Sequence, residues 1–192
     1  MTRNILWRGI EYNSLESCVL TNSDEGAEIK SSIIGMYNNV IYKVEYQIKT
    51  NGHWETIFFE INAQLNNKTN IISYRSDGKG NWFSDGNLIE KFSGCIDIDI
   101  SLTPFTNTLP INRLKLVEKK EKIIKVLYLD ILGQEVKAVH QKYTRLSQTD
   151  YRYENVPNDF ESIISVDETG LVVTYPQLFK REFVQECNNA LS

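Results

Sequence analysis

No stretch of the sequence approaches the roughly 20 consecutive apolar residues that a membrane-spanning helix needs. The apolar run nearest the N-terminus, residues 5–7, is also far too short for the hydrophobic core of a signal peptide. The chain is therefore expected to stay in the cytoplasm and to carry no transmembrane segment.

Cysteine and histidine are scarce. The chain has 3 cysteines, an odd number, and Cys18, Cys95 and Cys187 are widely spaced. This is a poor disulfide framework, and it fits three small buried apolar side chains in a reducing compartment. With 2 histidines and no Cys-x-x-Cys pair, the sequence favours no metal site, and we predict no cofactor.

An excess of basic residues is also missing. Lysine and arginine number 21, and aspartate and glutamate number 25, so the formal net charge is −4. A mildly acidic protein lacks the basic face that non-specific nucleic-acid binding needs. The length, without any Pro/Gly/Ser-rich linker, predicts a single domain over residues 1–192. A chain of this length buries roughly 70% of its unfolded surface without help from a disulfide or a metal.

Strand-forming patterns dominate the sequence. Tyrosine and isoleucine are abundant, and apolar residues often alternate with polar ones, as in half-buried strands. Asn51-Gly52 separates two such runs, and both residues tolerate positive φ, which indicates a hairpin. The sequence therefore predicts a mainly β fold with curved antiparallel sheets, as a barrel, roll or sandwich. Candidate strands lie at 41–48, 54–61, 71–74, 95–102, 114–117, 123–131, 136–146, 160–166 and 171–175.

One helix is predicted, near the C-terminus. Phe179, Phe183 and Cys187 recur at four-residue spacing, and Pro176 just before them suits a helix start. We therefore expect a helix over residues 177–189 that packs on the sheet.

Three pairs of similar segments occur in the same order along the chain. Together they predict two internal repeats, about 1–90 and 91–182, each of which would leave an apolar face for the other to bury. The paired segments are 17–19 with 94–96, 41–46 with 123–128, and 77–80 with 167–170.

The most unusual segment runs from residue 94 to residue 114. In a strand, Asp97 and Asp99 share one face, at roughly 6–7 Å from each other, and repel unless something compensates them. Arg113 and the hydroxyl and amide groups of 103–108 are the nearest candidates in sequence. Three interpretations stay open: a solvated outer face, a network that fixes the proline-bracketed loop, or a site for a polar ligand.

Other candidate residues lie in three further segments. Residues 75–82 contain two glycines but not the pattern of a P-loop, and Trp82 could stack on a sugar ring or anchor a hairpin. Gln141 and Tyr143 share a strand face that lines a cavity or covers the outer sheet. The ligand-binding candidates are Arg75, Trp82, Asp97, Asp99, Thr103, Thr106, Asn107, Arg113, Gln141, Tyr143 and Tyr175.

No known catalytic template is present. The sequence has no G-x-S-x-G elbow, no dinucleotide fingerprint, no H-E-x-x-H and no EF-hand loop. We therefore predict no catalytic residue, and an enzyme is the less favoured class.

Several of these motifs together resemble the Putative glycolipid-binding family of bacterial proteins. The likeness extends from about residue 6 to residue 181, and Thr-Pro-Phe-Thr-Asn-Thr-Leu-Pro-Ile at 103–111 is its most specific part. Asn112 stands where the family favours a second arginine, and Gln177 where a glycine usually follows Tyr175-Pro176. The motifs are Trp7 with Glu11, 75–82, 94–99, 103–113, 141–144 and 167–179.

The resemblance implies a spiral β-roll of two similar repeats, comparable to mycobacterial envelope lipoproteins whose curved sheets enclose an acyl-chain cavity. It assigns no catalytic residue. The first functional hypothesis is a non-catalytic protein that binds a glycolipid or an acylated small molecule, with the head group near Asp97, Asp99 and Arg113. The alternatives are a hydrolase of a sugar- or phosphate-bearing substrate that uses Asp97 and Asp99, and a structural or interaction domain without a small ligand. The sequence sets no oligomeric state.

Overall fold

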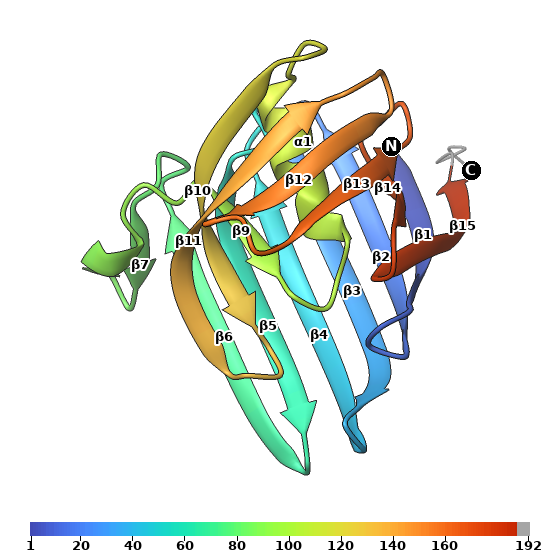
Figure 1. The fold of residues 1–192 in the computed structure, drawn as a ribbon. Coiled ribbons are helices and arrows are strands. Elements are labelled where there is room, and N and C mark those ends of the chain that lie inside the picture. The colour runs from blue at the N-terminus through green and yellow to red at the C-terminus, as the bar shows by residue number, and fades with distance from the viewer. Residues whose placement is uncertain (188–192) are drawn as a thin grey trace, which may run out of the picture.

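The computed structural model describes residues 1–187 and is mainly β, as the alternating pattern predicted (Figure 1). Two short 3-10 helices and one α-helix interrupt the strands. The elements are β1 (Thr2–Gly9), β2 (Ser14–Ser23), β3 (Gly26–Tyr37), β4 (Val40–Thr50), β5 (Thr56–Leu65), β6 (Lys68–Ser76), β7 (Trp82–Ser84), β8 (Asn87–Leu88), η1 (Glu90–Phe92), β9 (Asp97–Ile100), η2 (Phe105–Asn107), α1 (Thr108–Leu114), β10 (Glu121–Asp130), β11 (Glu135–Arg145), β12 (Asp150–Val156), β13 (Glu161–Val166), β14 (Val172–Tyr175) and β15 (Phe179–Cys187).

All strands belong to one open sheet. Its order is β8-β7-β6-β5-β4-β3-β2-β1-β15-β14-β13-β12-β11-β10-β9, so the first and last strands of the chain meet in its middle. Neighbouring strands are antiparallel except β9 and β10, which are parallel. The sheet curls, and β9 to β13 lie over the hollow side of β3 to β6 (Figure 1). This is the curved, roll-like sheet that the sequence and its family resemblance predicted.

Two apolar cores lie on opposite faces of β9 and β10. In β10, Leu127 and Leu129 join the larger core, which lines the hollow face of β1 to β6. Ile124 and Val126 in the same strand point the other way, into a smaller core built mostly from β12 to β15. Because strand side chains alternate, β10 must be apolar on both faces, which explains its nearly continuous apolar sequence.

The predicted helix over 177–189 is wrong for the part that the structure describes. Phe179–Cys187 is strand β15, which pairs with β1 along its length and with β14 at its start. A spacing of four residues is even, so it fits one face of a strand as well as one face of a helix. The backbones of β1 and β14 supply the hydrogen bonds that decide between the two. Residues 188–189 lie outside the described residues.

The α-helix that the described residues contain is elsewhere: it begins inside the segment 103–111, with its two prolines, and ends at Leu114. Together, η2 and α1 pass between the two cores, to which they contribute Phe105, Leu109 and Ile111. Neither α1 nor any other helix among residues 1–187 combines the length and apolarity of a membrane-crossing segment. The prediction of two repeats, and of one domain built from them, stays a prediction.

Trp7 connects the two halves of the sheet. Its indole ring is fully buried in the larger core, and its Nε1 donates a hydrogen bond to the carbonyl oxygen of Val172 at 2.8 Å. This bond joins β1 to β14, which are separated by β15 in the sheet.

We therefore expect Trp7→Phe to lower the free energy of unfolding by about 2 kcal/mol, because it leaves a buried carbonyl without its donor and opens a small cavity. Urea denaturation followed by fluorescence measures the change. Trp54→Phe is the matched control, since Trp54 is only half-buried and makes no indole hydrogen bond among the described residues. Equal effects of the two substitutions would contradict the role of Trp7.

Candidate ligand-binding cleft

Asp97 forms a buried ion pair with Arg113. The Arg113 Nε donates to Asp97 Oδ1 at 3.0 Å, and Nη2 donates to Oδ2 at 2.5 Å. The Asp97 side chain is fully buried, and that of Arg113 is 15% exposed. Burial raises the pKa of the Asp97 carboxyl, and the guanidinium opposes this shift. The pair therefore holds the end of α1 against β9, and Asp97 does not reach the cleft.

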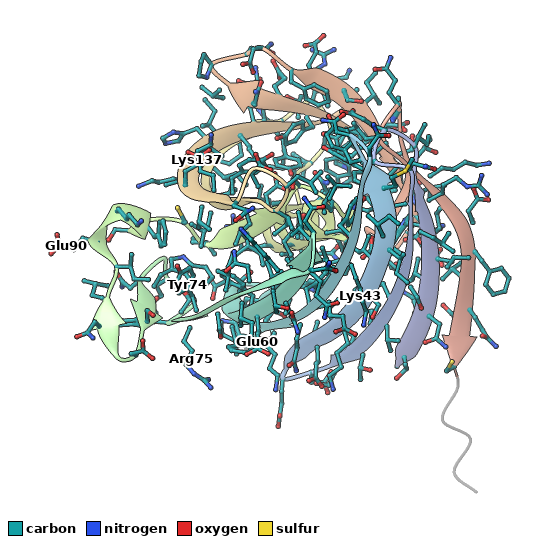
Figure 2. All side chains as sticks on the ribbon, turned by 90° about the horizontal axis from the view of Figure 1, so that it is seen from below. Lys43, Glu60, Tyr74, Arg75, Glu90 and Lys137 are labelled. Carbon is teal, nitrogen blue, oxygen red and sulfur yellow. The ribbon has the colours of Figure 1, made fainter. Side chains whose placement is uncertain are left out.

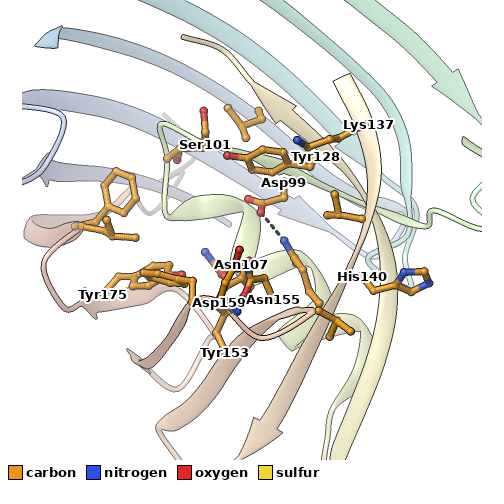
Figure 3. A pocket seen from close by; sticks show the side chains of 18 of the residues that line it. Asp99, Ser101, Asn107, Tyr128, Lys137, His140, Tyr153, Asn155, Asp159 and Tyr175 are labelled. Carbon is orange, nitrogen blue, oxygen red and sulfur yellow. Dashed lines mark hydrogen bonds between the residues drawn. The ribbon is translucent and has the colours of Figure 1, made fainter. Parts of the chain in front are cut away.

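Asp99 has different surroundings, although it points to the same side of β9. Thr106 Oγ1 donates to its Oδ1 at 3.1 Å. Gln141 Nε2 donates to its Oδ2 at 2.6 Å, the dashed line at Asp99 in Figure 3. No basic side chain within residues 1–187 forms an ion pair with Asp99. Burial raises the pKa of this carboxyl too. Asp99 thus faces the open space beside it without a basic partner among residues 1–187.

That open space is a half-open cleft of about 550 Å³ (Figure 3). Strands β9 to β12, the β12–β13 loop and the turn before β15 form its walls. Its polar wall includes Asp99, Ser101, Thr103, Asn107, Gln141 and Asn155. Its apolar wall includes Val139, Val156, Phe160, Leu178 and Phe179. A cleft of this size, mostly apolar with a few fixed polar groups, is typical of a small-molecule site.

A second hollow of about 600 Å³ adjoins the cleft. The two share Glu11, Tyr12, Ser101 and Tyr128, so these residues stand at the boundary between them. The outer walls of the second hollow come from the β3–β4, β5–β6 and β10–β11 turns.

The cleft brings together five of the residues that the sequence singled out. Asp99, Thr103, Asn107, Gln141 and Tyr175 line it, although they come from segments that are far apart in the chain.

Three other predicted residues do not line the cleft but hold those that do. Tyr143 is buried and donates from its hydroxyl to Asn107 Oδ1 at 2.8 Å. Thr106 orients Asp99, and Arg113 fixes α1, which directly follows the η2 turn that carries Thr106 and Asn107.

Arg75 and Trp82 lie away from the cleft. Trp82 is fully buried and donates from Nε1 to the carbonyl oxygen of Cys95 at 2.7 Å, so it anchors the chain and exposes no face for stacking. Arg75 lies on the opposite side of β6 from Tyr74 (Figure 2), with its guanidinium 5.1 Å from the centre of the Phe58 ring. Neither residue touches the space that the other candidates share.

Several lining residues were not predicted from the sequence, among them Tyr12, Tyr128, Tyr153 and His140. The sequence held a partial signal for Tyr128, because it shares a strand face with the apolar Ile124 and Val126. Its position opposite Asp99, however, depends on the parallel pairing of β9 with β10, which no local pattern indicates.

Glu16 is a second unpredicted residue, buried behind the cleft wall. Its Oε1 accepts hydrogen bonds from Tyr46 at 2.6 Å, Ser31 at 2.7 Å and Thr103 at 2.9 Å. Its Oε2 is buried without a partner among the described residues. Burial raises the pKa of this carboxyl to about 7. The signal in the sequence was that Glu16 shares a strand face with Cys18, a buried apolar position.

We expect Asp97→Asn to lower the free energy of unfolding by about 3 kcal/mol, because the substitution leaves the Arg113 guanidinium without its counter-charge. For a chain of this size the melting temperature should fall by about 10 °C, measured by circular dichroism. Asp85→Asn, which makes the same charge change in the exposed β7–β8 turn, is the control. An unchanged melting temperature for Asp97→Asn would exclude a structural role for the pair.

Glu16 predicts a pH-dependent stability. Between its ordinary pKa of 4.5 and its folded value of about 7, the folded protein holds a proton that the unfolded chain releases. The free energy of unfolding therefore falls as the pH rises through this window, by about 3 kcal/mol in all, and falls no further above it. Glu16→Gln should remove this contribution in urea denaturation at a series of pH values. Glu45→Gln, on the outer face of β4, should leave the profile as it is, and identical profiles for all three proteins would refute the prediction.

Comparison with known proteins identifies the family of this chain. The chain matches the family described as putative glycolipid-binding over residues 4–181. It is similar to the crystal structure of a DUF1089 family protein from Pseudomonas aeruginosa, with 33% sequence identity and a TM-score of 0.79 over 88% of this chain and 92% of that chain. No curated protein matches it. The resemblance found in the sequence motifs is confirmed: the chain belongs to the Putative glycolipid-binding family.

Proposed function

We propose that this protein binds an amphipathic ligand of the glycolipid class, without catalysis, in the cleft between β9–β11 and the β12–β13 loop. The observation that carries the proposal is that one cleft of about 550 Å³ joins an apolar wall to a cluster of fixed polar side chains. The family description favours the same class of ligand.

The apolar wall is suited to the ligand's hydrocarbon part. Val139 lies on β11, while Val156 and Phe160 flank the β12–β13 loop, and Leu178 with Phe179 closes the far side. Removing a hydrocarbon chain from water against such side chains gains about 25 cal/mol for each Å² of apolar surface. The adjoining hollow offers space for a ligand longer than the cleft.

The polar wall is suited to the head group. Asp99 is oriented by Thr106 and Gln141, and Asn107 is oriented by Tyr143. Side chains held in place before binding lose little conformational freedom when a ligand arrives, which increases affinity. In this proposal Asp99, Asn107 and Gln141 contact the head group, while Asp97 and Arg113 only support them.

The geometry gives less support to the alternatives. A hydrolase that uses Asp97 and Asp99 as a pair would need both carboxyls at the substrate, and Arg113 occupies both oxygens of Asp97. A purely structural role suits Asp97 but not Asp99, which faces the cleft without a counter-charge. A function in which Asp99 binds the ligand and the Asp97–Arg113 pair stabilises the fold accounts for both aspartates.

Occluding the cleft tests the proposal. Val139→Trp places an indole in the apolar wall and should prevent binding of an undecyl chain that carries a dansyl fluorophore, and it should also remove any lipid seen by native mass spectrometry of the purified protein. Val117→Trp, at an exposed loop position, is the matched control and should bind like the wild-type protein. A wild-type protein that carries no lipid and does not bind the fluorescent chain would refute the proposal.

A further inference from the structure

The charged groups around the cleft are mostly acidic. Glu11, Asp99 and Asp159 line it, against a single lysine, Lys137, and no arginine. The Lys137 Nζ already lies 2.7 Å from Glu135 Oε2 and is largely exposed. Protein sites for phosphate or carboxylate groups normally supply arginine, lysine or the N-terminus of a helix. The cleft presents no such group that is free.

Asp99 places its charge among tyrosine hydroxyl groups. Burial and the nearby Asp99 carboxylate together raise the pKa of Tyr128 to about 12. Burial and Asp99 also raise the pKa of Tyr153, and burial, the neighbouring Tyr153 and Asp99 raise that of Tyr175. These phenols therefore stay neutral at physiological pH and keep their protons for hydrogen bonding.

Two of these hydroxyl groups lack a partner. Tyr153 and Tyr175 are only 8% and 5% exposed, yet neither hydroxyl makes a hydrogen bond with any of residues 1–187. Both residues line the cleft, and their rings pack edge to face with centroids 6.1 Å apart. Their hydroxyl oxygens are not among the buried unpartnered atoms of residues 1–187, so they are open to the cleft and available to a ligand.

Besides the tyrosine hydroxyls, which can donate or accept, the cleft offers acceptor oxygens on Gln141 and Asp99. Gln141 uses its Nε2 on Asp99, which leaves its Oε1 free, and Asp99 itself can only accept hydrogen bonds while it is ionised. A head group that both donates to these oxygens and accepts from the tyrosine hydroxyls can use all of these groups at once. Sugar and polyol hydroxyls donate and accept, whereas an ionised phosphate offers acceptors only.

From these contacts we infer that the cleft selects ligands whose head group is uncharged and rich in hydroxyl groups, and that it rejects anionic head groups such as phosphates. The inference rests on the proposed function, since it concerns the ligand of the same cleft. The inference adds that the cleft discriminates between uncharged and anionic head groups, and that Asp99 determines this discrimination.

Three compounds with the same octyl chain separate the effect of the head from that of the tail: octyl β-D-glucoside, octyl phosphate and octanol. Isothermal titration calorimetry below the micelle-forming concentration should show wild-type protein binding the glucoside at least tenfold more tightly than either of the others. Asp99→Asn removes the charge but keeps the shape, so it should weaken glucoside binding about tenfold and strengthen octyl phosphate binding.

Two further variants keep the result interpretable. Tyr175→Phe removes a hydroxyl that has no partner among residues 1–187, so it should keep the fold, checked by circular dichroism, and weaken glucoside binding severalfold. Asp85→Asn, which does not line the cleft, should leave all three affinities unchanged.

The outcomes distinguish this inference from the proposed function. Octyl phosphate or octanol binding as tightly as the glucoside would overturn the selection by head group and leave lipid binding intact. An effect of Asp85→Asn equal to that of Asp99→Asn would also overturn it. The affinities would then depend on the net charge of the protein and not on the carboxylate in the cleft. Failure of all three octyl compounds to bind would overturn both.

Discussion

The burial of β9 and β10 on both faces is the constraint on which the rest of the structure depends. One face of this pair contributes Leu127 and Leu129 to the larger core, on the hollow face of β1 to β6. The other face contributes to the smaller core, built mostly from β12 to β15. Asp97 and Asp99 lie on that second face and therefore enter the interior with their charges. Buried carboxylates need partners, so the segment that follows must return and supply them, which it does through Thr106 and Arg113.

The same constraint divides the work between the two aspartates. Asp97 lies where α1 covers the strand, and its charge is neutralised completely by one guanidinium. Two residues further along β9, α1 no longer covers the strand. There Asp99 accepts hydrogen bonds from Thr106 and Gln141 at the edge of the cleft. A difference of two positions along one strand thus separates a residue that stabilises the fold from one available to a ligand.

Local patterns predicted much of this structure. Alternation identified β4 to β6, β9 to β11, β13 and β14, and Asn51-Gly52 marked the turn between β4 and β5. It missed β1 to β3, β7, β8 and β12, and the strand predicted at 114–117 is wrong, because α1 ends at Leu114 and an irregular segment follows it. Arg113 was correctly taken as a candidate partner, and it pairs with Asp97. Other failures arose where partners are distant in sequence. The strand β15 was taken for a helix because its decisive hydrogen bonds come from β1, and the contact between Asp99 and Gln141 spans 42 residues. The residues that neighbour a position in the sequence do not encode such contacts. Glu16 is an exception, because its place on an apolar strand face indicated a buried carboxyl.

The meeting of β1 and β15 in the middle of the sheet has a kinetic consequence. Within each half, successive strands pair as neighbours along the chain. Except for the parallel pair β9 and β10, which η2 and α1 connect, these pairs are hairpins that require only short loops to close. The joint between the halves pairs Thr2 with Cys187 and closes a loop of almost the entire chain. Such long-range pairing is slow, and until it forms, β1 presents an unpaired edge to other molecules. The period before this joint closes is thus when the folding chain is most open to aggregation.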